Sequence, residues 1–239
     1  MKEVYFTSAG IDVQAKELLE TVLPLRARNE KRQAFNPEEA ALLILDMQRY
    51  FLDESSHAYI PSANAIIPNV ICLREKFLNR GLPVFLTRHI NTKANAGQMG
   101  TWWRDLITRE SPSSSLADSI FHEKAFLLEK CQYDAFFLTD LEKLLSAQGV
   151  KQVVITGVMS HLCCETTARS AFVRGFQVFF VIDGTADYNR HFHLASLLNL
   201  SHGFALPVLT RELTDIFASL PRTAFQSQER EEHCPGGKQ

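Results

Sequence analysis

The sequence predicts a single α/β domain of three layers, in which helices cover both faces of a mostly parallel sheet. Short apolar runs without polar alternation, typical of strands buried on both faces of a sheet, recur along the chain. Longer amphipathic stretches lie between them and end at glycines, as many helices do. Strands and helices that alternate in this way indicate parallel strands joined by right-handed crossovers.

The individual elements follow from these patterns. The apolar runs predict strands at 41–45, 83–87, 153–156, 178–182 and 207–209. Helical patterns fill the gaps at 62–80, 140–148, 161–174 and about 191–202, with Gly81, Gly149, Gly175 and Gly203 directly after them. We therefore expect a Rossmann-like central sheet.

The ends of the chain differ in composition from its middle. Residues 1–38 are polar and helix-like, and we interpret them as an N-terminal helical extension packed against the domain. The domain itself is expected to span residues 39–220. Residues 221–239 carry a run of charged side chains followed by glycines, which predicts a polar, solvated tail.

Composition excludes several classes of protein. The chain has 239 residues, with 25 Lys and Arg against 27 Asp and Glu, so its formal net charge is −2. There is no basic run to indicate nucleic-acid binding. No apolar stretch approaches the roughly 20 residues of a membrane span, and the N-terminus lacks the apolar run of a secretory signal. We expect a soluble, cytoplasmic protein with neither nucleic-acid nor membrane partners.

The cysteines indicate free thiols in a reducing compartment. They are odd in number, scattered, and contain no C-x-x-C spacing, which argues against both a disulfide framework and a zinc ribbon. Their positions are Cys72, Cys131, Cys163, Cys164 and Cys234.

Ligands of open parallel sheets bind beyond the carboxyl ends of the strands, so the residues that follow each run are the candidates for a site. Asp46 follows the first run, Arg88 and His89 the second, residues 157–164 the third and Asp183 the fourth. No G-x-G-x-x-G or Walker A loop follows a strand, which counts against a dinucleotide or P-loop enzyme.

Three places in the sequence carry groups that could do chemistry. Cys163 and Cys164 lie near a predicted helix N-terminus, where the helix dipole stabilises a thiolate, although an inert buried cysteine is equally compatible. Asp46 could be a general base raised in pKa by burial, or a cap of the next turn. Lys130 ends another apolar segment, at 125–129, but an isolated lysine is usually a solvated surface group.

Taken together, three blocks resemble the isochorismatase-like cysteine hydrolases. They are L-I-L-D-M-Q at 43–48, K-C-Q-Y-D-A-F at 130–136 and G-V-M-S-H-L-C-C-E-T-T-A at 157–168, and the resemblance runs from about 40 to 210. It implies a catalytic triad of Asp46, Lys130 and Cys163, with Cys164 as a packing neighbour. It also implies a non-proline cis peptide at Val158–Met159, and an oxyanion hole formed by the backbone N–H groups of Met159 and Cys163.

The resemblance implies a role for each group. Asp46 takes the thiol proton, Lys130 stabilises the thiolate, and Cys163 attacks a carbonyl carbon to form a thioester-like intermediate. Amidases of the family use this cysteine, whereas its isochorismatases carry glycine there and protonate a vinyl ether from the aspartate. Cys163 therefore favours hydrolysis of a small amide. The alternative is vinyl ether hydrolysis with Asp46 as general acid. It stays open because the sequence around Cys163 resembles the isochorismatase branch more closely than the amidase branch.

Further residues are expected to bind the small-molecule substrate. Candidates are Gln48, Phe51, Arg88, whose guanidinium could grip a carboxylate, and Trp103 of the pair Trp102-Trp103, for which core or subunit-interface packing is the alternative. Nicotinamidases place an Asp-x-His metal site after the second strand, but here that place reads His89-Ile90-Asn91, so we expect no metal. No organic cofactor is implied, and the family suggests a homo-oligomer, a dimer or tetramer.

Several interpretations compete with this one. His89 is read first as a solvated or capping residue, and His191 and His193 as surface histidines. A non-catalytic, flavodoxin-like binding module would explain the fold but not the Asp–Lys–Cys combination. A thiol redox protein could use the pair Cys163 and Cys164, although adjacent cysteines form strained disulfides.

Overall fold

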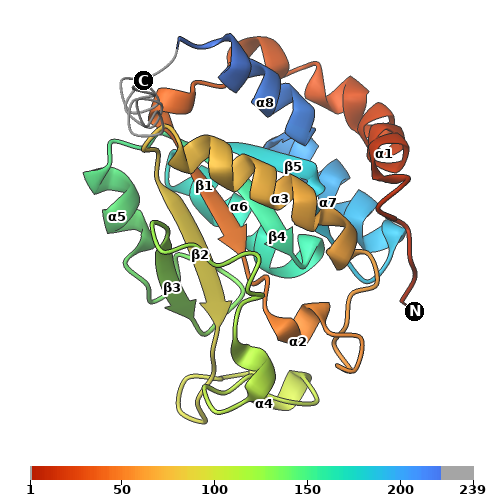
Figure 1. Ribbon diagram of the computed structural model, residues 1–239, viewed down its shortest axis with the longest axis vertical. Helices are drawn as coiled ribbons and strands as arrows, with labels where there is room; N and C mark the ends of the chain where they lie inside the picture. The colour runs from red at the N-terminus through yellow and green to blue at the C-terminus, as the bar shows by residue number, and fades with distance from the viewer. Residues whose placement is uncertain (1, 222–239) are drawn as a thin grey trace, which may run out of the picture.

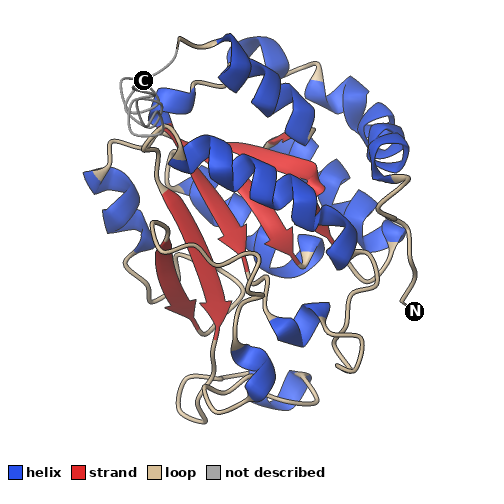
Figure 2. Cartoon of the chain, in the orientation of Figure 1, coloured by secondary structure: helices blue, strands red, loops and turns tan. Residues whose placement is uncertain are grey.

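A computed structural model describes residues 2–221 and contains one six-stranded sheet in which every pair of neighbouring strands is parallel (Figures 1 and 2). The strands are β1 (Ala40–Leu45), β2 (Val84–His89), β3 (Phe126–Lys130), β4 (Gln152–Val158), β5 (Gln177–Ala186) and β6 (Leu206–Val208). Their spatial order is β3-β2-β1-β4-β5-β6, the order of a Rossmann-like sheet. The predicted α/β fold is confirmed.

Eight α-helices surround this sheet within the described part of the chain. They are α1 (Ile11–Arg26), α2 (Arg49–Leu52), α3 (Ala63–Leu78), α4 (Met99–Trp102), α5 (Leu141–Ala147), α6 (Glu165–Val173), α7 (Arg190–Gly203) and α8 (Thr210–Ser219). The right-handed crossovers put α3, which joins β1 to β2, on the face opposite to α6, which joins β4 to β5 (Figure 1). None of the helices in residues 2–221 has the length and apolar character that a membrane span requires.

Position in the sheet explains the composition of the strands. Every residue of the central strands β1 and β4 is buried, which accounts for their unbroken apolar runs. The edge strand β3 is different, because Phe126 and Leu127 are exposed and burial increases only toward Lys130 at its end. The sheet thus delivers Lys130 from its edge to its buried carboxyl side.

The N-terminal segment contributes to the core of the fold. Helix α1 packs on α7 and on the strands β5 and β6, and Leu18 on its inner face is fully buried. Before it, the backbone N–H groups of Tyr5 and Phe6 both donate to Ser62 Oγ at 3.0 Å. Residues 222–239, which hold Cys234 and nearly all of the predicted tail, lie outside the described residues.

Some boundaries differ from those that the sequence predicted. Gly81, Gly149 and Gly175 follow helices with φ of 68°, 67° and 89°, the left-handed conformation that favours glycine. Gly203 instead is the last residue of α7, and Phe204 is the C-cap of that helix. The helix predicted at 161–174 begins with a π-helical turn, Ser160–Cys164, before α6 starts at Glu165.

The strand β5 continues past its predicted end. A register shift against β4 near Gly157 lets β5 run on to Ala186, so Asp183 lies inside the strand. Its carboxylate accepts hydrogen bonds from the backbone N–H and the hydroxyl of Thr210, at 2.7 and 2.9 Å. Asp183 therefore anchors the start of α8 instead of facing a ligand.

Candidate active site

Asp46 lies directly after β1, in the middle of the carboxyl edge of the sheet. It is fully buried, and its φ of 51° is unusual for a residue other than glycine. The hydroxyl of Thr87, on the neighbouring strand β2, accepts from the Asp46 N–H at 3.1 Å and donates to Oδ1 at 2.6 Å. The second carboxylate oxygen, Oδ2, lies 2.7 Å from Nζ of Lys130. Two strands thus fix the orientation of this carboxylate.

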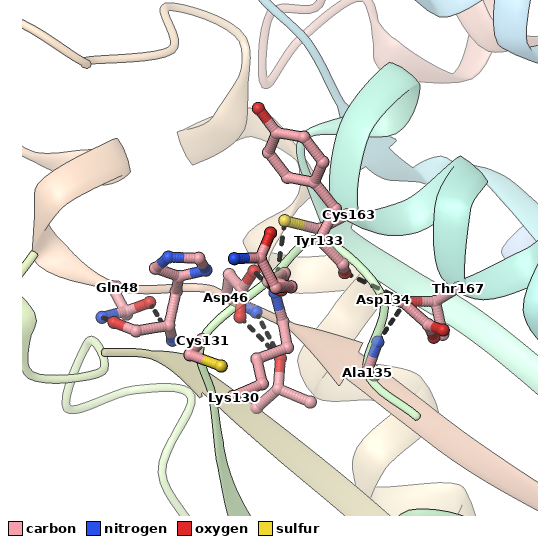
Figure 3. Close-up of polar contacts among 12 residues, drawn as sticks. Asp46, Gln48, Lys130, Cys131, Tyr133, Asp134, Ala135, Cys163 and Thr167 are labelled. Atoms are coloured by element: carbon pink, nitrogen blue, oxygen red, sulfur yellow. Dashed lines mark hydrogen bonds and ion pairs between the residues drawn. The ribbon is translucent and has the colours of Figure 1, made fainter. Parts of the chain in front are cut away.

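Lys130 brings Asp46 and Cys163 into one constellation (Figure 3). Its side chain is fully buried, and Nζ donates to Cys163 Sγ at 3.3 Å and to the carbonyl of Gln132 at 2.9 Å. An ammonium buried this deeply persists in a protein only when it is paired and hydrogen-bonded. The three residues that the family resemblance selected therefore meet at one point.

The pKa values of the three groups indicate their resting charges. Burial opposes the charge on Asp46, but the Lys130 ammonium and a hydrogen bond from Cys163 hold the pKa of Asp46 below its ordinary value of 3.8. Burial likewise opposes the charge on Lys130, yet Asp46 and Cys163 raise its pKa above 10.5. Burial, followed by Asp46, raises the pKa of the Cys163 thiol above 9.0. The resting Cys163 is thus a thiol, because burial and the neighbouring Asp46 carboxylate outweigh the stabilising effect of Lys130 on a thiolate.

A tight turn presents Cys163 to this pair of charges. The peptide bond between Val158 and Met159 is cis, as the resemblance implied, and Cys163 lies in the π-helical turn that follows. Gly157 has a φ of 108°, and a Cβ atom there would lie 2.1 Å from the carbonyl oxygen of Leu45. Only glycine fits this close approach of β4 to β1.

The turn is held to the end of β5 by a residue that the sequence analysis did not select. The carboxylate of Asp187 accepts hydrogen bonds from His161 through its backbone N–H, at 2.8 Å, and through Nδ1, at 2.7 Å. The N–H of Asp187 in turn donates to the Tyr5 hydroxyl at 2.8 Å. No sequence pattern indicated this contact, since the three residues come from distant segments.

A cavity of about 150 Å³ opens beside Cys163. Its walls are largely aromatic and aliphatic, with polar groups from a few side chains, and they include Tyr50, Phe51, Met99, Trp103, Ile107, Tyr133, Met159, Leu162 and Tyr188. The indole N–H of Trp103 donates to the Tyr133 hydroxyl at 2.7 Å. Among the predicted substrate-binding residues, Phe51 and Trp103 thus line this cavity, whereas Trp102 is 77% exposed.

The other two predicted substrate-binding residues do not line it. Arg88 pairs with Glu129 of the adjacent strand, because β2 extends through His89 and alternation turns Arg88 to the opposite face from Thr87 and His89. Gln48 is buried, and its amide bonds the backbone of its neighbours: Oε1 accepts from His89 N–H at 2.7 Å, and Nε2 donates to the carbonyls of His89 and Ser114 at 3.1 and 2.7 Å. It braces the wall of the cavity from behind.

Of the three histidines expected to be solvated or at the surface, His89 and His193 are buried, whereas His191 is exposed as expected. His89 lines the cavity with a 2.7 Å contact from Nε2 to Asn91 Oδ1, and burial followed by the Lys130 ammonium lowers its pKa to about 4. His193 is fully buried, because its face of α7 packs inward, where it contacts the hydroxyls of Tyr5 and Thr185. Within residues 2–221 no three His, Cys, Asp or Glu side chains converge in a way that could hold a metal ion.

Comparisons of the sequence and of the fold with known proteins agree on one family. The model of the Isochorismatase domain matches residues 40–212. The sequence is 39% identical over 175 residues to "Nicotinamidase 3" of Arabidopsis thaliana, covering 71% of this chain and 84% of that protein. It is 33% identical over 189 residues to "Enterobactin synthase component B" of Escherichia coli (strain K12), covering 78% and 66%. A cysteine hydrolase from Pseudomonas syringae pv. phaseolicola 1448A has a similar fold, with a TM-score of 0.75 and 22% identity over 79% of this chain and 96% of that one.

Proposed function

This chain belongs to the isochorismatase-like hydrolase family, and we propose that it hydrolyses the amide bond of a small, single-ring carboxamide through Cys163. The observation that carries the proposal is the position of Lys130, whose Nζ contacts both the Asp46 carboxylate at 2.7 Å and Cys163 Sγ at 3.3 Å, beside a cavity. A nucleophile, a base and a fixed cation within hydrogen-bond reach are what covalent hydrolysis needs.

The size and lining of the cavity support a substrate with one ring. A cavity of about 150 Å³ binds benzene in another protein, and the cavity here has the same volume. Its walls are mainly apolar, with Phe51 and Trp103 among them, so a flat ring would be held by burial and aromatic contact. A nicotinamidase, an amidase by name, stands among the relatives of this chain.

The reaction would proceed in two halves. As the thiol of Cys163 attacks the amide carbon, its proton passes to Asp46, and Lys130 offsets the charge that remains on sulfur. Collapse of the tetrahedral adduct breaks the C–N bond, and the proton on Asp46 leaves with ammonia. Asp46 then takes a proton from water, whose oxygen attacks the thioester. The carboxylic acid departs and the thiol is restored.

The backbone of the tight turn would stabilise the intermediate. We assign the oxyanion hole to the N–H groups of Met159 and Cys163, which both line the cavity at the carboxyl end of β4. Removing one such donor from an enzyme typically costs about 10²–10³ in kcat. The anchoring of His161 by Asp187 would keep these groups in place.

Vinyl ether hydrolysis with Asp46 as acid is the second candidate, favoured by the isochorismatases among the relatives. Two observations weigh against it. The pKa of Asp46 lies below its ordinary value despite burial, because Lys130 and other partners favour the carboxylate, which cannot protonate a substrate. Isochorismate carries two carboxylates, but Arg88 faces Glu129, and Arg104 at the cavity mouth has a side chain 77% exposed.

The two candidates separate in one experiment. Ammonia release from benzamide, nicotinamide and five-membered ring carboxamides is measured beside the conversion of isochorismate, for the wild type and for Cys163→Gly and Cys72→Ser. We expect amide turnover that Cys163→Gly reduces by at least about 10³-fold and that the exposed control Cys72→Ser retains. Isochorismate turnover that survives Cys163→Gly, with no ammonia from any amide, would overturn the proposal.

A further inference from the structure

A chain of hydrogen bonds fixes the orientation of one amide in the cavity wall. The side-chain nitrogen of Asn91 donates to the backbone carbonyl of Cys131 at 2.9 Å. A carbonyl oxygen can only accept, so the NH₂ group of Asn91 must face Cys131. Its other atom, Oδ1, therefore faces Nε2 of His89 at 2.7 Å.

The amide in turn fixes the protonation of His89. Oδ1 of Asn91 is an acceptor, so Nε2 of His89 carries the hydrogen that lies between them. Burial and the nearby Lys130 ammonium lower the pKa of His89 to about 4, which makes the ring neutral at pH 7. A neutral imidazole has a hydrogen on one nitrogen only, and Nδ1 of His89 consequently holds a lone pair.

Nothing within residues 2–221 donates a hydrogen bond to this lone pair, and Nδ1 is not among the buried atoms left without a partner, so it is open to the cavity. His89 lines the cavity beside Cys163. Its backbone is held by Gln48, which bonds both its N–H and its carbonyl. The ring is thus fixed at the main chain and at Nε2, while its remaining nitrogen has no hydrogen-bond partner among the described residues.

We infer that Nδ1 of His89 accepts a hydrogen bond from the substrate, and that the site selects ring carboxamides that present an N–H or O–H donor to the end of β2. Pyridine carboxamides, whose ring nitrogen only accepts, would place a second lone pair against Nδ1. This inference rests on the proposed function, since it specifies the substrate class of the same cavity. His89 is a specificity residue here, and Asn91 acts through it.

The expected discrimination follows from the cost of an unsatisfied buried acceptor. A matched donor gains a hydrogen bond and a mismatched lone pair leaves two buried acceptors unpaired, so pyrrole carboxamides should bind about tenfold or more tightly than pyridine carboxamides. Benzamide, which offers the ring position neither a donor nor an acceptor, should fall between them.

Binding is measured by calorimetry on Cys163→Ala, which removes turnover, with the isomers of pyrrole and pyridine carboxamide and with benzamide. Asn91→Leu in the same background keeps His89 but removes the acceptor that fixes its hydrogen. The ring can then offer either nitrogen as donor, and the preference should shrink to less than about threefold. Equal binding of the two ring classes, a preference for pyridine, or a preference that survives Asn91→Leu overturns the inference.

A spectroscopic measurement tests the same point without any ligand. Long-range ¹H–¹⁵N correlation of histidine-labelled protein at pH 7 should show His89 with hydrogen on Nε2 and a bare Nδ1. A hydrogen on Nδ1 overturns the inference whatever the binding data show. Ammonia release by the wild type reports separately on the proposed function: turnover without ring preference refutes only the inference, and ring preference without turnover refutes only the function.

Discussion

The cavity has a buried ion pair behind Cys163 and an exposed ion pair at its rim, and the two differ in how far water screens their charges. We call the buried group of Asp46, Thr87, Lys130 and Cys163 the floor. Cys163 lines the cavity, and behind it the side chains of the Asp46–Lys130 ion pair have no exposed surface, with their charges 2.7 Å apart. The rim consists of His57, Arg104 and Asp105, where Nδ1 of His57 lies 3.5 Å from Asp105 Oδ2 and the two side chains are 37% and 54% exposed. Water screens the rim but not the floor, so similar pairings should differ severalfold in their energetic weight.

Lys130→Met tests the floor with the largest expected effect. It leaves the charge of Asp46 buried without a partner, which should cost about 3–5 kcal/mol of unfolding free energy, and should abolish measurable turnover. Urea denaturation and ammonia release measure the two effects. Lys143→Met, which removes a lysine whose side chain is 84% exposed, is the matched control and should change stability by less than about 0.5 kcal/mol.

A double substitution sharpens this prediction. Adding Asp46→Asn to Lys130→Met removes the stranded charge, and stability should recover while activity stays lost. If Lys130→Met alone proves as stable as the wild type, the floor is more hydrated than its burial indicates.

Acid should destabilise the cavity wall at His89. The pKa of His89 is lowered from 6.5 to about 4 in the folded chain by burial and Lys130, so the unfolded chain binds more protons between these values. The stability that the neutral ring contributes is complete above pH 6.5 and is lost as pH falls toward 4, by up to about 3 kcal/mol. His89→Gln should flatten this part of the stability profile measured by urea titration. An unchanged slope would show that His89 is protonated without penalty.

Thr87→Val removes only the hydroxyl that orients Asp46. The carboxylate loses a 2.6 Å hydrogen bond while its charge pair remains, so kcat should fall about 10–100-fold with little change in KM. Thr87→Ser keeps a hydroxyl and should retain most of the activity. A Val variant as active as the wild type would show that Lys130 alone orients the Asp46 carboxylate.

The rim should give the smallest effects. Asp105→Asn breaks an exposed pair, and we expect less than about 1 kcal/mol in stability and less than about threefold in KM, with both differences vanishing in high salt. Urea denaturation and steady-state kinetics, each at two salt concentrations, measure the two effects. A tenfold loss of kcat would assign the rim to the catalytic machinery.

The sequence could predict the residues that follow strands, because the topology of a parallel sheet fixes where the strands end. Asp46 and the turn that carries Cys163 follow apolar runs at strand ends, where fold topology brings them to one edge of the sheet, whereas Lys130 was selected through the family resemblance. Arg88 was misplaced because the apolar run hides the true end of β2, and one residue decides which face a strand side chain occupies. If the predicted strand had continued to His89, the alternation of side chains along it would have placed Arg88 on the face opposite to Thr87 and His89.

Other contributions to the site left no local signal. Thr87 acts through its register with β1, and Gln48 through backbone groups that only folding brings within its reach. The rim comes from residues 53–60 and 92–110, whose loops approach each other for reasons of packing and not of periodicity. Sequence patterns thus predicted the strand ends and missed the contacts between segments.

The hydroxyl of Tyr5 meets Nδ1 of His193 across 188 positions of the chain, a separation that matters during synthesis. Ribosomes add about 5–20 residues per second, so about 10–40 s pass before the first residues can find their partner. Until then Phe6, which is almost fully buried in the finished fold, lacks its edge-on contact with the His193 ring and is open to chaperones. Nascent chains stalled before residue 185 should therefore leave residues 2–22 sensitive to protease, whereas full-length released chains should protect them.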